Sequence, residues 1–131
     1  MSEQTRSLIE RHDDAWNAQD VEALVELYAD DVVFQNHTAG EPAVAGRAAV
    51  IEHIARIFER WPDMRFTSRR LYLADSFCTS EWTATATSPD GRQIEWDGVD
   101  VMPIRDGAIA RKDVYSTSHI ARDKTDFLHG S

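Results

Sequence analysis

The segment Asp100-Val101-Met102-Pro103-Ile104-Arg105-Asp106-Gly107-Ala108-Ile109-Ala110-Arg111-Lys112-Asp113 has the pattern of two strands joined by a tight turn. Asp-Gly between two strand-forming runs favours a two-residue type I′ turn, because both central residues of that turn need positive φ. The turn pairs Arg105 with Ala108, and counting back along both strands places Asp100 opposite Asp113. We therefore predict an antiparallel hairpin with these two aspartates as direct neighbours on one face.

The paired aspartates are candidates for general acid–base chemistry. Opposed residues in such a pair have Cβ atoms about 5 Å apart, and like charges placed so are destabilising. On a buried face, repulsion and desolvation raise the pKa of at least one carboxyl, which suits it to proton transfer near neutral pH. Trp96, Met102 and Tyr115 share the face in this register and favour such a pocket. The alternative is a solvated pair that Arg111 and Lys112 neutralise with little energetic consequence.

Upstream of the hairpin, the hydrophobic spacing is first helical and then strand-like. Apolar residues recur at one-turn spacing in three segments, which predicts helices that end near Asn17, Tyr28 and Trp61. Asp20 is the expected cap of the second helix, and a short strand over 32–36 and a loop over 37–46 precede the third. From residue 65 onward we predict four long antiparallel strands. The layout is α+β, with three N-terminal helices packed on a curved antiparallel sheet.

The composition limits the classes of partner and the organisation of the chain. With 131 residues we predict a single domain over 1–121 and a polar C-terminal tail over 122–131. The net charge of −9 disfavours nucleic acid, and no apolar run is long enough to cross a membrane. The single cysteine, Cys78, has no partner for an internal disulfide, which is typical of a cytoplasmic protein. Because no metal-ligand spacing occurs, we expect neither a metal nor another cofactor.

The serial order of several short segments resembles the nuclear transport factor 2-like superfamily, and within it the SnoaL-like branch of polyketide cyclases and ketosteroid isomerase-like proteins. These segments are Trp16-Asn17-Ala18-Gln19-Asp20, Leu27-Tyr28-Ala29-Asp30-Asp31-Val32-Val33-Phe34, Gly46-Arg47, Trp61-Pro62-Asp63, Glu81-Trp82-Thr83-Ala84-Thr85, Gly98-Val99-Asp100-Val101 and Arg105-Asp106-Gly107. The resemblance implies a cone-shaped α+β barrel that encloses an apolar pocket for a small molecule, commonly in a homodimer. Because this fold hosts many chemistries, function depends on the site.

The resemblance also assigns candidate roles to individual residues. Similarity to ketosteroid isomerase places Asp100 near that enzyme's oxyanion-hole aspartic acid, and similarity to the polyketide cyclases places Asp113 near their catalytic aspartate. Apart from the resemblance, the predicted hairpin face offers Tyr115 as a second candidate oxyanion donor. His37, after the first strand, is a candidate base at the pocket mouth, although a surface-loop histidine is the alternative. The candidate substrate-binding residues, which are otherwise plain core, are Trp16, Phe66, Trp82, Trp96 and Met102.

Two classes of function follow. The first is a cofactor-independent enzyme that acts on a small apolar carbonyl or polyketide-like compound by general acid–base proton transfer, as an isomerase, cyclase or hydratase. The second is a non-catalytic domain of the same fold that binds a small ligand or a partner. An epoxide hydrolase is a further alternative, in which Arg111 would have to supply the arginine from the opposite strand.

Overall fold

The computed structural model describes residues 2–117 and 120–121, so the predicted tail over 122–131 lies outside the described residues. Three helices form where the hydrophobic spacing predicts them: α1 spans Ser2–Ala18, α2 spans Val21–Val25 and α3 spans Arg47–Arg60. Asp20 caps α2, because its carboxylate accepts a hydrogen bond from the backbone N–H of Ala23 at 3.1 Å.

The strands form one mixed sheet in the order β2-β1-β6-β5-β4-β3, with β7 paired to β5. Their bounds are Tyr28–Asn36 for β1, Val44–Ala45 for β2, Arg65–Leu73 for β3, Phe77–Thr87 for β4, Gln93–Arg105 for β5, Ala108–Ser116 for β6 and Ile120–Ala121 for β7. The four long strands are confirmed. Two details differ from the prediction: β1 runs parallel to β6, and it begins at Tyr28, which pairs with Ile109 before a bulge.

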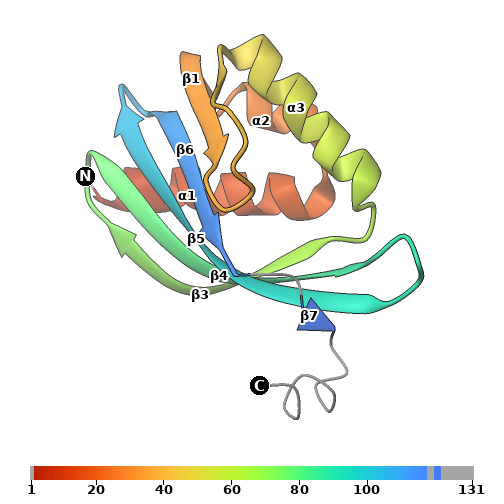
Figure 1. Cartoon of the computed structure of the whole chain (residues 1–131). Coiled ribbons are helices and arrows are strands. Elements are labelled where there is room, and N and C mark those ends of the chain that lie inside the picture. The colour runs from red at the N-terminus through yellow and green to blue at the C-terminus, as the bar shows by residue number, and fades with distance from the viewer. Residues whose placement is uncertain (1, 118–119, 122–131) are drawn as a thin grey trace.

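The sheet is strongly bent, and all three helices lie on its concave side (Figure 1). The sheet does not close, since β2 and β3 stand at the two ends of its path. Side chains alternate along β4, where Cys78, Ser80, Trp82, Ala84 and Ala86 are buried and the residue between each two of them is not. The buried residues pack under α1 and α3, so the α+β cone predicted from the sequence is confirmed.

The predicted register of the β5–β6 hairpin is wrong beyond the turn. Arg105 pairs with Ala108 as expected, but Asp100 pairs with Val114, and Asp113 pairs with Val101. Between the pairs Ile104–Ile109 and Val101–Asp113, β5 has two residues and β6 has three, so β6 carries a bulge. A shift of one residue turns every following side chain to the other face. Asp100 and Asp113 are therefore not neighbours.

Candidate functional site

The bulge turns Lys112 inward, where it forms a buried ion pair with Asp100. The Lys112 Nζ lies 3.0 Å from Asp100 Oδ2, and the two side chains are only 6% and 7% exposed. Lys112 Nζ also stands 4.3 Å from the ring centroid of Trp16, which is the geometry of a cation–π contact. A charged pair at this depth needs such partners, because desolvating either charge alone is costly.

His12 of α1 extends the pair toward the surface. Its Nε2 lies 3.3 Å from Lys112 Nζ, and its Nδ1 lies 3.0 Å from Asp13 Oδ1. Burial, and then the adjacent Lys112 charge, lower the pKa of His12 below its ordinary value of 6.5, although Asp13 and Asp100 oppose this shift. A neutral ring beside an ammonium accepts through Nε2, so the Nδ1–H donates to Asp13. Asp13, His12, Lys112 and Asp100 thus form one continuous chain.

Two adjoining cavities, of about 130 and 470 Å³, meet at this chain. Both are lined by Trp16, Phe66, Trp82, Asp100 and Lys112. The smaller one also reaches His12 and Asp13, and the larger extends toward α3 and the segment after β1. The larger volume lies within the usual range for small-molecule sites, about 300–1,000 Å³. The ion pair therefore lies at the junction of a ligand-sized space.

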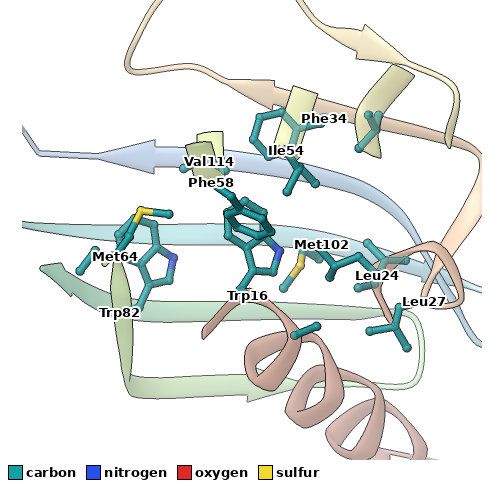
Figure 2. Close-up of a cluster of buried hydrophobic side chains, with 14 of the residues drawn as sticks. Trp16, Leu24, Leu27, Phe34, Ile54, Phe58, Met64, Trp82, Met102 and Val114 are labelled. Carbon is teal, nitrogen blue, oxygen red and sulfur yellow. The ribbon is translucent and has the colours of Figure 1, made fainter. Parts of the chain in front are cut away.

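The walls around the ion pair are mostly aromatic. Trp16 comes from α1 and Trp82 from β4. In the view of Figure 2, side chains of α3, β1 and β6 lie above these two indoles. The Phe66 ring packs edge to face against both indoles, and its centroid lies 5.7 Å from that of Trp16 and 5.0 Å from that of Trp82. Gly98 lies opposite Trp82, and a Cβ there would fall 2.3 Å from the Trp82 ring. Only glycine at this position lets the indole lie across β5.

Two buried polar atoms have no hydrogen-bond partner among the described residues: Asp100 Oδ1 and Trp82 Nε1. Both side chains line both cavities. By contrast, the neighbouring indole of Trp16 is satisfied, since its Nε1 donates to the Tyr28 hydroxyl at 3.2 Å. The site therefore presents one free acceptor and one free donor within aromatic walls.

The remaining candidates gather on the outer face of the sheet. His37 Nε2 lies 2.7 Å from Asp113 Oδ1, Arg111 Nε donates to Asp113 Oδ2 at 2.8 Å, and the His37 ring stacks on Tyr115 at 4.4 Å. Partial burial raises the pKa of Asp113, but Arg111 and then His37 outweigh it, so the pKa lies below its ordinary value of 3.8. We call His37, Arg111, Asp113 and Tyr115 the outer cluster. None of the four lines either cavity.

The structure therefore divides the predicted site residues into two groups. Of the candidate substrate-binding residues, Trp16, Phe66, Trp82 and Trp96 line the larger cavity, while Met102 is fully buried opposite Cys78 and lines neither. Arg111 faces outward with Asp113, so it does not supply the pocket arginine that the epoxide hydrolase alternative requires. Tyr115, predicted to share the pocket face, is 45% exposed.

The sequence did not indicate Lys112 and His12 as site residues. In the predicted hairpin register Asp113 faces the pocket, so Lys112, the preceding residue, would face solvent. One signal was available. Pro103 has no N–H for the ladder, and a proline in an interior strand is typical of a bulge. His12 is buried in α1, and its partner Lys112 comes from a strand a hundred residues away.

Within residues 2–117 and 120–121, no group of three or more His, Cys, Asp or Glu side chains is placed to hold a metal ion. Over the same residues, no helix has the length and apolar character needed to span a membrane.

Comparison with known proteins places the chain in a family. The sequence model of the SnoaL-like domain matches residues 9–112, which includes residues 9–18 of α1, the ion pair and most of the sheet. The chain belongs to the SnoaL-like domain family. No curated protein matches this SnoaL-like protein.

Several solved structures share its fold. An NTF2-like protein of unknown function from Mesorhizobium loti is 28% identical, with 89% of this chain and 93% of that chain covered and a TM-score of 0.74. A candidate ketosteroid isomerase from Kribbella flavida is 23% identical, with 89% and 80% covered and a TM-score of 0.74. A candidate SnoaL-like polyketide cyclase from Jannaschia is 18% identical, with 88% and 86% covered and a TM-score of 0.80. The last two show likeness of fold alone.

Proposed function

We propose that this SnoaL-like protein is a cofactor-independent enzyme that moves a proton on a small apolar carbonyl or polyketide-like compound, as an isomerase, cyclase or hydratase does. The observation that carries the proposal is the state of Asp100, whose Oδ2 is held by Lys112 while its buried Oδ1 has no partner beside an aromatic cavity. Neighbouring structures that carry the names of isomerases and cyclases support the choice of reaction class.

Asp100 acts as the general base in this proposal. Its Oδ1 takes a proton from the carbon next to the substrate carbonyl: the C–H bond breaks, an O–H bond forms on the carboxylate, and the electron pair moves to the carbonyl oxygen. The resulting enolate then takes the proton back from Asp100 at another carbon, or attacks a second carbonyl to close a ring, in which case the alkoxide so formed takes the proton from Asp100. A positioned base contributes about 10²–10⁴-fold to such a step.

Lys112 stabilises the charge that moves. When Asp100 accepts the proton, negative charge leaves the carboxylate and appears on the substrate oxygen within the same dry space. The Lys112 ammonium, 3.0 Å from Asp100 Oδ2, faces the charge in both states without having to relocate. Fixed charges of this kind are effective because they need no reorganisation during the reaction.

His12 and Asp13 position the ammonium. A neutral His12 Nε2 accepts from Lys112, and Asp13 holds the imidazole in that tautomer through Nδ1. Asp13 is 34% exposed at its side chain, whereas His12 is 2% exposed. The chain therefore runs from the cavity to the edge of the solvent, where Asp13 fixes its outer end.

The test is exchange of the α-protons of 1-tetralone and related enolisable ketones in D₂O, followed by proton NMR. The wild type should exchange them faster than buffer, and Asp100→Asn should lose at least about 100-fold of that rate. Asp97→Asn is the matched control, because Asp97 lies on β5 too but is 54% exposed and outside both cavity linings. Circular dichroism checks that each variant is folded. Equal rates for Asp100→Asn and the wild type would remove Asp100 from the mechanism.

A further inference from the structure

The unpaired donor and acceptor together describe the polar group of the ligand. A buried N–H or carboxylate oxygen without a partner is uncommon in folded proteins and costs about as much as a lost hydrogen bond. Here the two unpaired atoms have opposite hydrogen-bonding character and belong to side chains, Asp100 and Trp82, that line the same two cavities. A ligand that satisfies both must accept one hydrogen bond and donate another.

Lys112 does not replace Trp82 as the donor. An ammonium has three N–H groups, and the contacts of Lys112 Nζ already number three: Asp100 Oδ2 at 3.0 Å, His12 Nε2 at 3.3 Å and the Trp16 ring at 4.3 Å. The Trp82 indole nitrogen has no hydrogen-bond partner among the described residues, so its N–H is available to a ligand. In the view of Figure 2, that nitrogen is on the ring edge turned toward Trp16, the residue from α1 that lines both cavities with it.

The Trp82 indole is also held in place without using its N–H. Phe66 packs against it edge to face at 5.0 Å and 88°, and the bare backbone of Gly98 receives the ring on the neighbouring strand. Both contacts are apolar, so they fix the ring plane and leave the donor free. A rigid donor of this kind loses little conformational entropy when a ligand binds.

We propose that the cavity takes a small, mostly apolar molecule whose one polar end is a hydroxyl or enol oxygen, and that Trp82 Nε1 donates to this oxygen while its hydrogen is donated to Asp100 Oδ1. The inference rests on the proposed function for its reaction and extends it to the substrate class. Proton abstraction leaves an enolate oxygen in the same position, with the former α-hydrogen now on Asp100 Oδ1, so Trp82 is a catalytic residue that donates to the developing oxyanion.

The experiment compares three ligands of nearly equal shape: 1-tetralol donates and accepts, 1-tetralone only accepts, and tetralin does neither. Affinities are measured by calorimetric titration of the wild type. We expect 1-tetralol to bind at least about tenfold more tightly than tetralin, with 1-tetralone between them, since sites that hydrogen-bond a hydroxyl discriminate against analogues without it. Equal affinities for 1-tetralol and tetralin, or no binding of 1-tetralol at millimolar concentration, would overturn the proposal.

Trp82→Phe isolates the donor. It should reduce the 1-tetralol to tetralin affinity ratio at least fivefold, whereas Trp96→Phe, which changes another cavity-lining indole on the adjacent strand, should shift the three ligands alike. In ¹⁵N-labelled protein, 1-tetralol and 1-tetralone should move the Trp82 indole resonance downfield more than tetralin does. The Trp16 resonance, already bonded to Tyr28, is the internal reference. An unchanged ratio in Trp82→Phe would contradict the proposal.

Binding and catalysis can fail separately in these measurements. If the ligands are ranked as expected but no α-proton exchanges in D₂O, the ligand class stands and the proposed enzymatic function falls. If exchange occurs and depends on Asp100, but Trp82→Phe leaves the affinity ratio unchanged, the function stands and the role of Trp82 falls.

Discussion

The inner ion pair and the outer cluster come from adjacent residues of β6 and have opposite properties. Lys112 faces the cavities and pairs with Asp100, with both side chains less than a tenth exposed. Asp113, the next residue, faces outward, and both of its carboxylate oxygens are bonded, one to His37 and one to Arg111. The inner pair leaves one carboxylate oxygen unsatisfied, whereas the outer cluster satisfies both. Unused hydrogen-bonding capacity, more than the presence of a carboxylate, marks the site where a ligand is expected.

The largest difference between the two regions should appear when one cation is removed from each. Lys112→Met leaves Asp100 buried and without its counter-charge, so we expect a loss of about 3–5 kcal/mol in the free energy of unfolding. Arg111→Met, on the outer face, should cost no more than about 1 kcal/mol. Urea denaturation measures both. The double variant Asp100→Asn/Lys112→Met should recover part of the inner loss, and similar losses for both single variants would contradict the contrast.

A methyl group on the inner face should also be costly. Gly98→Ala places a Cβ within 2.3 Å of the Trp82 ring, and the displaced indole should cost about 1–3 kcal/mol of stability. Val99→Ala, on the next residue and the opposite face, is the control and should cost less because its side chain is only partly buried. The indole resonance of Trp82 should shift in Gly98→Ala, and an unshifted resonance with unchanged stability would show that the ring does not lie across β5.

Acid should weaken the inner chain at higher pH than the outer cluster. Because the pKa of His12 is lowered in the folded protein, the unfolded chain binds more protons below pH 6.5, and stability falls as pH falls from there. One such proton gives a slope of up to about 1.4 kcal/mol per pH unit. His12→Gln keeps an acceptor for Lys112 but does not titrate, so denaturation curves between pH 7 and 5 should show a flatter slope. An unchanged slope would mean that His12 does not remain neutral.

The smallest effect should come from Asp113. Its pKa is lowered in the folded protein, so its contribution is complete above the ordinary value of 3.8 and is lost as pH falls through the lower, folded value. Asp113→Asn should therefore cost less than about 1 kcal/mol at neutral pH and flatten only the limb of the stability curve below pH 4. An unchanged limb below pH 4, or a loss well above about 1 kcal/mol at pH 7, would contradict this expectation.

The sequence predicted the fold more completely than the site, for a physical reason. Helical spacing around Leu8 and Trp16 and the Asp106-Gly107 turn are local signals, and both formed as expected. The face on which Lys112 lies depends on a single extra residue in β6, for which Pro103 in the facing strand is the one local signal. The pairing of His12 with Lys112 depends on how α1 lies across the sheet, and only the folded chain determines that.

The most direct test of the account compares Asp100→Asn with Asp113→Asn in the α-proton exchange assay. If the inner ion pair is the reactive centre, Asp100→Asn should lose at least about 100-fold in rate, and Asp113→Asn should stay within about twofold of the wild type. Should Asp100→Asn be unstable, the double variant Asp100→Asn/Lys112→Met, which leaves no unpaired charge, replaces it. A rate that collapses in Asp113→Asn and persists in Asp100→Asn would place the chemistry on the outer face and contradict the account.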